Sequence, residues 1–386
     1  MFNIKNKDEE DNCLPTIYWL PKMHKNPSGA RFIIAGKKCI NKKLTQYITS
    51  VFKLCFNQFE SYHKKMHYHT WTKTFWVIQN NNSPLESIQK INKRNNAKQI
   101  STFDFSTLYT KIPHDELLEV LYNIVDFVFK GGTRDVISID RLGNSSWSTC
   151  KNGHTYYFTK SSLKEAITFI LRNCYFSFGN ISLRQIIGIP MGSDPAPFFA
   201  NLFLAFYEIR WTNDQRKLGV INTRKLNNTF RFIDDLLSLN DDSIFESSYN
   251  SIYPTEMELK KENSTNNAAT FLDINISIEN GKLCTKLFDK RDNFGFDIVR
   301  MPFASSNMSG KMFYGSIGAE FLRIARATSK IEDLSFTCKQ LLTRMSSQGS
   351  RRNKTKSLLT KMIQRHWDSF EKYEISINEI LNKVGL

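Results

Sequence analysis

Two adjacent aspartates, Asp234 and Asp235, lie in the middle of an apolar run that extends from Phe230 to Leu239. Adjacent acids usually mark a solvated loop, but bulky residues flank these two on both sides. The pattern predicts two strands that meet at a tight turn, with both acids at its tip. Removing like charges from water costs on the order of several kcal/mol per ion unless a positive charge compensates them. A divalent cation would provide that compensation, so a third carboxylate elsewhere in the chain would indicate a metal site.

Asp104 supplies such a carboxylate. It lies near the polar end of an apolar strand predicted over 99–109. A strand-end aspartate beside a hairpin tipped by Asp234 can place two or three carboxylates around one point, and Mg²⁺ prefers such oxygen ligands. Two such ions about 3.5–4 Å apart stabilise the attacking and leaving oxygens of a phosphoryl displacement. For Asp104 alone, an aspartate that merely caps a strand would be the preferred interpretation.

The composition points to a polyanionic partner. The 386 residues carry a formal net charge of +16, and nucleic acid is the commonest partner of such a basic protein. With 41% hydrophobic and 13% aromatic residues, the chain is not largely disordered. No stretch approaches the roughly 20 apolar residues of a transmembrane helix, and the polar start over 1–11 argues against a signal peptide. The cysteines are scattered without paired spacing, which is typical of reduced intracellular thiols.

Three histidines, His63, His67 and His69, could be interpreted as a zinc cluster. Lys64 and Lys65 lie between them, and no other metal ligand is close in sequence. We therefore prefer a solvated basic helix face over a zinc site.

Strand and helix patterns alternate irregularly up to about residue 300, which predicts an α+β fold rather than a doubly wound parallel sheet. A hairpin is expected over 14–34, followed by a basic, aromatic-rich helix over 41–80 that the run 80–84 breaks. The change in composition near residue 300 is the expected subdomain boundary. The remaining expected elements are helices at 115–129, 162–173 and 198–211, hairpins turned at 151–153 and 179–180, strands at 256–261 and 270–278, and basic helices from 313 onward.

Four motifs resemble those of reverse transcriptases, specifically the Penelope-like element class, and they follow one another along the chain in the order of that family. The segment 104–110 (Asp-Phe-Ser-Thr-Leu-Tyr-Thr) resembles the first catalytic motif of that family. The segment 188–204 resembles the substrate-binding loop and helix, and 232–235 resembles the catalytic hairpin. The segment 20–25 (Leu-Pro-Lys-Met-His-Lys) resembles one that is typical of Penelope-like enzymes.

The resemblance covers roughly residues 14–350. It implies a right-hand polymerase with fingers, a palm built on an antiparallel sheet, and a helical thumb. The expected domains are a lead-in (1–13), the first part of the fingers (14–98), the first part of the palm (99–130), a fingers or palm insertion (131–187), the rest of the palm (188–300) and the helical thumb with a C-terminal tail (301–386).

The resemblance also assigns roles to the acids and to one tyrosine. Asp104 and Asp234 would be the main metal ligands, with Asp235 a third, less direct acid. The cofactor would be Mg²⁺, with Mn²⁺ as an alternative. Tyr109 would be the steric gate that excludes a ribose 2′-OH by stacking under the deoxyribose. A half-buried strand aromatic is the alternative interpretation of Tyr109.

Several cations match residues of the family that handle the triphosphate. Lys22, Lys25 and Arg31 match the finger residues that bind the incoming nucleotide, where cations are needed as charge develops on the leaving pyrophosphate. Lys260, which is adjacent to Lys261, aligns with the lysine that protonates this pyrophosphate. For each of the three finger cations taken singly, a solvated surface residue is an equal alternative, and Arg31 is favoured because apolar residues flank it.

The loop before the helix at 198–211 is the expected nucleotide-binding loop. It contains Met191 and Gly192, and the absence of a Cβ at Gly192 would let the backbone approach the template–primer and the nucleotide. Basic residues of the C-terminal helices would grip the duplex backbone as a thumb. They are Arg323, Arg326, Arg351 and Arg352.

The expected function is that of an RNA-directed DNA polymerase, which extends the 3′-OH of a DNA primer with deoxynucleotides on an RNA template. The expected location is inside the cell, in the nucleus, and no membrane partner is expected. The alternative is a catalytically silent RNA- or DNA-binding fragment, or a domesticated copy, on the same fold. A telomerase-like enzyme would need an RNA-binding domain upstream, and only 13 residues precede the first motif. Nothing resembles the GIY-YIG endonuclease of many Penelope-like elements, so a fragment or an endonuclease-deficient member is expected.

Overall fold

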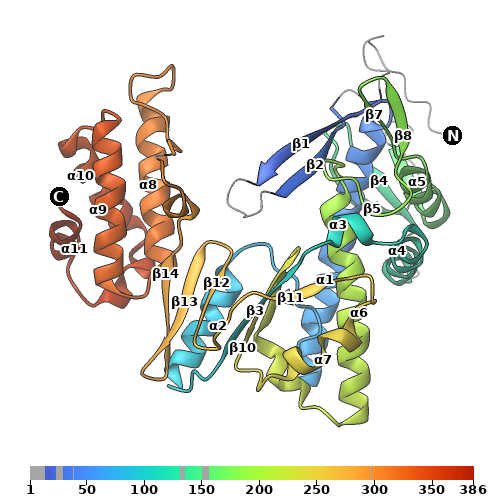
Figure 1. The fold of residues 1–386 in the computed structure, drawn as a ribbon, viewed down its shortest axis with the longest axis horizontal. Coiled ribbons are helices and arrows are strands. Elements are labelled where there is room, and N and C mark those ends of the chain that lie inside the picture. The colour runs from blue at the N-terminus through green and yellow to red at the C-terminus, as the bar shows by residue number, and fades with distance from the viewer. Residues whose placement is uncertain (1–13, 23–28, 38, 131–134, 150–155, 297) are drawn as a thin grey trace. The chain divides into compact units, whose positions relative to one another are not determined.

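The computed structural model describes residues 14–22, 29–37, 39–130, 135–149, 156–296 and 298–386 (Figure 1). The chain divides into two compact units. Unit 1 comprises residues 1–79 and 103–260, and unit 2 comprises residues 80–102 and 261–386. Each unit is therefore built from two separate stretches of chain. The chain passes between the units after residues 79, 102 and 260, and none of these positions is the subdomain boundary expected near residue 300.

Unit 1 contains the first hairpin, a set of long helices and the strands around the acidic hairpin. Its elements are β1 (Thr16–Lys22), β2 (Gly29–Ala35), α1 (Lys42–Thr70), most of β3 (Ile100–Phe105), α3 (Leu108–Lys111), α4 (His114–Phe129), β4 (Val136–Ile139), β5 (Ser145–Ser148), β6 (Tyr156–Thr159), α5 (Lys160–Arg172), β7 (Tyr175–Phe178), β8 (Ile181–Arg184), α6 (Ala196–Leu218), β9 (Thr229–Phe232), β10 (Asp235–Leu239), α7 (Ile244–Ile252) and β11 (Leu259–Lys261), with a 3₁₀ turn at Thr223–Asn228. The unit boundaries fall within β3 and β11.

The core of unit 1 forms where α1 packs against α4, α5 and α6. The apolar residues that the sequence places at helical spacing in α1 are all buried there, among them Ile48, Phe52 and Phe56. The ring of Phe52 meets Phe199 of α6 edge to face, with centroids 4.9 Å apart. These helices form a rigid platform beneath the strands, because burial of such side chains is the main stabilising contribution to a fold.

Two sheets of unit 1 bear on the site. The first has the strand order β2-β1-β7-β8, and the second has the order β11-β3-β10-β9. In the second sheet β9 and β10 form the predicted hairpin, in which Phe232 is paired with Asp235. A third sheet has the strand order β5-β4-β6 and shares no strand with these two. The expected hairpin turn at 151–153 lies outside the described residues.

Unit 2 combines a small antiparallel sheet with helices (α8 to α11 orange to red and α2 blue in Figure 1). Its elements are α2 (Asn82–Lys93), the sheet β12 (Ala268–Phe271), β13 (Ile274–Glu279) and β14 (Lys282–Leu287), a 3₁₀ turn at Lys290–Asn293, the helices α8 (Gly310–Ala327), α9 (Ile331–Ser347), α10 (Arg352–Arg365) and α11 (Ile377–Val384), and two 3₁₀ turns at Trp367–Ser369 and Glu371–Tyr373. Helices α2, α8 and α9 pack against β14.

Several expected elements differ from the structure. The strand expected over 99–109 ends at Phe105, and Tyr109 lies in the short helix α3 (Leu108–Lys111). The strand expected over 270–278 is two strands, because the chain turns back at Leu272, whose φ is +55°. The helix expected over 41–80 ends at Thr70, and the run 80–84 begins α2 instead of breaking a helix. The capping box of α5 uses Thr159 and Ser162, three residues before the expected start. No helix in the described part of the chain is long and apolar enough to cross a membrane.

Candidate active site

The acidic hairpin has a two-residue turn. Since Phe232 and Asp235 are paired, Ile233 and Asp234 form the turn between β9 and β10. Asp234 is therefore at the tip, whereas Asp235 is the first residue of β10, which corrects the expectation that both acids share the tip. Ile233 has a φ of +56°, a left-handed conformation that is strained for a β-branched residue. The position of Asp234 thus depends on whatever holds this strained turn in place.

Asp104 lies beside this turn, as the sequence predicts. The backbone N–H of Phe105, the next residue in β3, donates to the carbonyl oxygen of Asp234 at 3.1 Å. Both aspartates are half-buried. Two segments that lie 130 residues apart in sequence therefore meet at this hydrogen bond, and each contributes an aspartate next to it.

The described residues contain no cluster of three or more His, Cys, Asp or Glu side chains arranged to hold a metal ion. The ligands available at the hairpin are thus two or three aspartate oxygens. This set suits Mg²⁺, which retains several waters and binds proteins through one or two carboxylates together with substrate phosphates. The histidine cluster does not form a site: His63 is buried, its Nδ1 lies 3.0 Å from Thr74 Oγ1, and burial lowers its pKa to about 4. For His63, the expectation of a solvated face is wrong.

Tyr109 lies within electrostatic reach of the acids. It follows β3 in the short helix α3 and is half-buried. Burial is the main reason that its pKa is raised to about 12, and the negative charge of Asp234 raises it further. The positive charges of Arg31 and Arg231 act in the opposite direction. Tyr109 therefore stays a neutral phenol that shares its surroundings with Asp234 and with Arg31.

The loop 188–195 connects the sites of Tyr109 and Arg31 through backbone hydrogen bonds. The N–H of Ile189 donates to the carbonyl oxygen of Tyr109 at 2.8 Å, and the N–H of Ile34 in β2 donates to the carbonyl oxygen of Met191 at 2.7 Å. The loop thus fixes strand β2 against helix α3. The loop therefore connects strand β2, which carries Arg31, to the helix that carries Tyr109.

Two glycines make this loop possible. At Gly188, with φ +82°, an added Cβ would lie 2.5 Å from the carbonyl oxygen of Tyr109. At Gly192, with φ +110°, it would lie 2.3 Å from the carbonyl oxygen of Ile34. The close approach that requires glycine at position 192 is therefore to the protein's own β2. Asp194 anchors the end of the loop, because it accepts hydrogen bonds from Lys42 Nζ and Thr45 Oγ1 of α1.

The register of the first hairpin puts two of the expected triphosphate cations on one face. Leu20 pairs with Arg31 and Lys22 pairs with Gly29, so Lys22 and Arg31 both project to the face that also carries Ile33. The Cγ2 atom of Ile33 lies near Gly192 of the loop. This face of the hairpin therefore meets the loop. Lys25 lies outside the described residues.

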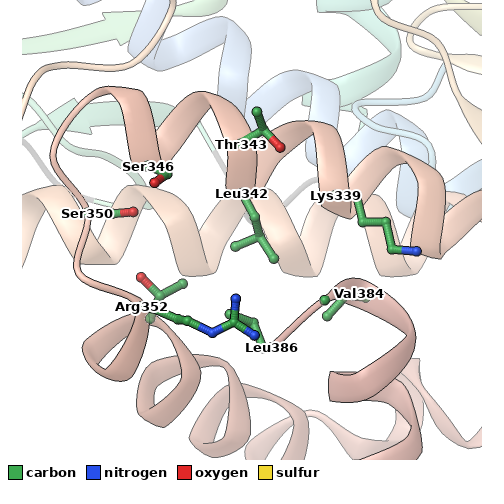
Figure 2. Close-up of a pocket in the computed structure, with 10 residues that line it drawn as sticks. Lys339, Leu342, Thr343, Ser346, Ser350, Arg352, Val384 and Leu386 are labelled. Carbon is green, nitrogen blue, oxygen red and sulfur yellow. The ribbon is translucent and has the colours of Figure 1, made fainter.

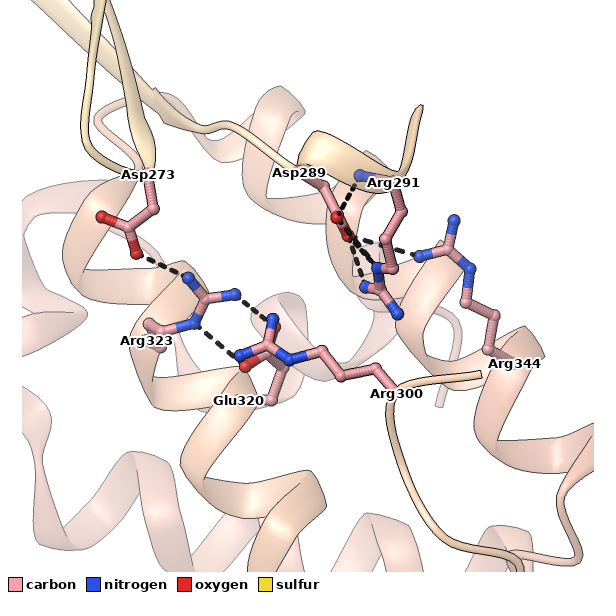
Figure 3. A network of polar contacts seen from close by, with 7 residues as sticks. All are labelled: Asp273, Asp289, Arg291, Arg300, Glu320, Arg323 and Arg344. Carbon is pink, nitrogen blue, oxygen red and sulfur yellow. Dashed lines mark hydrogen bonds and ion pairs between the residues drawn. The ribbon is translucent and has the colours of Figure 1, made fainter. Parts of the chain in front are cut away.

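Lys260 and the thumb arginines lie in different surroundings. Lys260 is exposed on β11. Arg323 donates to Asp273 and to both carboxylate oxygens of Glu320, so its guanidinium is already paired (Figure 3). Arg326 is exposed and donates to Ser369 Oγ at 3.4 Å. Arg351 and Arg352 are exposed at the start of α10.

Arg352 also lines a pocket of about 390 Å³ in unit 2, together with Lys339 of α9 and residues near Val384 (Figure 2). A second network in this unit joins Asp289 to Arg291 and Arg344 (Figure 3). Pairing with Arg291 lowers the pKa of Asp289 to about 2.

Sequence reasoning missed the residue that holds the turn. Arg231 is fully buried beneath it and forms an ion pair with Glu208, which is also fully buried. Its Nη1 atom donates to the carbonyl oxygen of Ile233 at 3.0 Å. The signal available in the sequence for this residue was a cation between Phe230 and Phe232 in an apolar strand.

The mixed α/β fold of this chain is similar to that of two solved telomerase structures. Telomerase from Candida albicans in complex with the TWJ fragment of telomeric RNA aligns with 99% of this chain, at a TM-score of 0.64 and 12% identity. Telomerase from Candida tropicalis without bound RNA also aligns with 99%, at a TM-score of 0.51 and 12% identity.

The likeness concerns the fold alone, because the identity is low. The chain spans 64% and 61% of the lengths of these two telomerase chains, which is less than two thirds. No protein-family model matches the sequence. No curated protein matches it either.

Proposed function

We propose that this chain is an RNA-directed DNA polymerase of the Penelope-like class, which extends a primer 3′-OH by metal-assisted nucleotidyl transfer. The observation that carries the proposal is the hydrogen bond from Phe105 N–H to the Asp234 carbonyl oxygen, which brings Asp104 and Asp234 together. The motifs around these acids and the segment 20–25 support the class. The RNA in the Candida albicans telomerase complex supports an RNA template.

In this mechanism Asp104 and Asp234 would hold Mg²⁺, with Asp235 as a further, less direct acid. The chemistry that Mg²⁺ would supply there is positive charge for the primer 3′-oxygen and for the triphosphate. Arg31 and Lys22, on the same face of the hairpin, neutralise charge as it develops on the leaving pyrophosphate. Tyr109 packs beneath the sugar of the incoming nucleotide.

Two more roles complete the scheme. Lys260 donates a proton to the pyrophosphate, and its exposure on β11 leaves the ammonium group accessible. The exposed arginines Arg326, Arg351 and Arg352 contact the phosphates of the duplex. Arg323 contributes by joining Asp273 to Glu320 within unit 2.

The test is primer extension with Mg²⁺ on matched RNA and DNA templates. We expect extension on RNA by the wild-type protein and a loss of at least about hundredfold for Asp234→Asn, since a directly bound ligand acts in the transition state. Asp214→Asn is the matched control, because Asp214 is an exposed carboxylate on α6 away from the hairpin. Equal extension by wild type and Asp234→Asn would refute the metal assignment.

The second candidate function is nucleic-acid binding without catalysis, which the net charge of +16 favours independently of the acids. It predicts salt-sensitive binding to RNA–DNA hybrids and no nucleotide incorporation. Binding without extension by the wild-type protein would decide for this function. A GIY-YIG reading frame in the genomic flanks would support the Penelope-like assignment.

A further inference from the structure

A buried arginine lies beneath the turn that carries Asp234. The side chain of Arg231 is fully buried. Its backbone is fixed on both sides, because its N–H donates to the Trp76 carbonyl oxygen at 2.8 Å and its carbonyl oxygen accepts from Ile78 N–H at 2.9 Å. A buried charge is costly unless it is paired and fully hydrogen-bonded. The partners of Arg231 therefore indicate what it does.

All five N–H donors of the Arg231 guanidinium have acceptors. Nε and Nη2 donate to the two carboxylate oxygens of Glu208 at 2.5 and 3.1 Å. Nη1 donates to Asn201 Oδ1 at 2.9 Å and to the Ile233 carbonyl oxygen at 3.0 Å, and Nη2 also donates to the Asn201 carbonyl oxygen at 3.1 Å. Asn201 and Glu208 lie seven residues apart on α6, so they share one face of that helix. The guanidinium thus ties the turn to helix α6.

The Glu208 carboxylate has its own support. Tyr253 donates its hydroxyl hydrogen to Glu208 Oε1 at 2.9 Å. Burial and the adjacent Glu208 charge raise the pKa of Tyr253, so the phenol remains a donor. The ion pair is therefore neutral and fully bonded. Its charge is not available to phosphate, and Arg231 acts through the backbone of the turn.

We propose that Arg231 is a positioning residue, which holds the Ile233 carbonyl so that the turn keeps its left-handed conformation and Asp234 stays beside Asp104. A β-branched residue at a φ of +56° keeps this conformation only when its surroundings hold it there. The bond from Arg231 is the side-chain contact that does so. This inference rests on the proposed polymerase activity.

The test uses Arg231→Lys, which preserves the charge opposite Glu208. An ammonium group has three donors on a single atom and cannot span both Glu208 and the Ile233 carbonyl as the planar guanidinium does. We expect the Mg²⁺ concentration for half-maximal extension to rise and kcat to fall by about tenfold to hundredfold, as for a misplaced catalytic group. The KM for the deoxynucleotide should change by less than about twofold, because Arg31 and Lys22 lie on a different sheet.

A second variant separates positioning from general stability. Asparagine adopts the left-handed conformation more readily than isoleucine does. Because the Ile233 side chain also packs against the core, Ile233→Asn alone should lower the free energy of unfolding, and its own Mg²⁺ dependence is the reference for the double variant. Added to this reference, Arg231→Lys should change the Mg²⁺ dependence by less than about twofold, because the turn no longer needs to be held. Thermal melts and circular dichroism confirm that each variant is folded.

Amide hydrogen exchange gives a readout that needs no activity. In Arg231→Lys, the exchange of Phe105 N–H, which is bonded to Asp234, should accelerate. Three results would overturn the inference: an unchanged Mg²⁺ dependence in an active Arg231→Lys enzyme, unchanged exchange at Phe105, or no rescue by Ile233→Asn. Absence of extension by the wild-type protein is a different failure, which removes the proposed function and this inference with it.

Discussion

Replacement of Gly192 by alanine tests whether the loop 188–195 must lie directly against β2. An added Cβ would be 2.3 Å from the Ile34 carbonyl oxygen, whereas ordinary contact begins at 3.4 Å. The loop and the strand must therefore separate by about 1.1 Å. A separation of this size breaks the bond between Ile34 N–H and the Met191 carbonyl oxygen, which is 2.7 Å long.

The expected cost has two parts. The lost hydrogen bond contributes about 0.5–1.5 kcal/mol. Alanine at a φ of +110° adds about 1–3 kcal/mol of backbone strain. We therefore expect Gly192→Ala to lower the free energy of unfolding by about 2–4 kcal/mol.

The matched control is Gly219→Ala. Gly219 also has a positive φ, of +68°, but no atom lies within 4 Å of its added Cβ. Gly219→Ala should lower the free energy of unfolding only by the conformational cost of alanine at a positive φ, about 1–2 kcal/mol. Urea denaturation measures both variants, and primer extension gives the KM for the deoxynucleotide. That KM should rise only for Gly192→Ala, because Arg31 lies on the displaced strand.

Equal destabilisation by the two alanines, together with an unchanged KM, would refute the reasoning. It would mean that the loop and β2 relax without cost to the site. The glycine would then be explained by its φ alone.

Three further predictions address the gate, a buried lysine and the thumb. Tyr109→Ala should admit ribonucleotides, measured as the ratio of kcat/KM for deoxynucleotides to that for ribonucleotides, and an unchanged ratio would exclude Tyr109 from the gate. Burial lowers the pKa of Lys73 to about 7. Between pH 7 and pH 10 the unfolded chain therefore binds a proton at Lys73 that the native chain does not, and the free energy of unfolding rises with pH. Urea denaturation at pH 7 and pH 9 should show a smaller rise for Lys73→Met than for wild type, and equal rises would contradict the assignment. Arg326→Gln should reduce the salt dependence of hybrid binding by about one ion. Arg323→Gln should mainly destabilise unit 2, because it removes two hydrogen bonds to Glu320 and leaves that carboxylate the longer ion pair with Arg300, at 3.6 Å. A larger loss of salt dependence for Arg323→Gln than for Arg326→Gln would contradict the ion-pair geometry.

The local elements with strong patterns could be predicted from the sequence. The acidic hairpin, the first hairpin and the helix α4 (His114–Phe129) all form where period-2 or helical apolar spacing occurs. The reversal at Leu272 could not, since leucine seldom adopts a positive φ and no glycine or asparagine marks the turn. Proline at 84 was interpreted as a helix breaker, although the first turn of a helix tolerates it.

The candidate site was only partly predictable for the same reason. Asp104 and Asp234 carry a signal in their own sequence context, because each is an acid in an apolar strand. The role of Arg231 depends on Glu208 and Asn201, which lie on a helix earlier in the chain. The need for glycine at 192 depends on a strand about 160 residues away. Such requirements come from tertiary contacts, and local sequence patterns do not contain them.

The two crowded glycines have a consequence for how a gene of this kind loses function. Copies that are no longer under selection accumulate substitutions at all codons, and the aspartates are the usual positions inspected for damage. At Gly188 and Gly192 a Cβ would overlap the backbone of Tyr109 or Ile34. A copy that retains every acid but encodes another residue at either glycine has already lost the geometry of the site. These two codons are therefore an early record of whether a lineage still depends on the proposed polymerase activity.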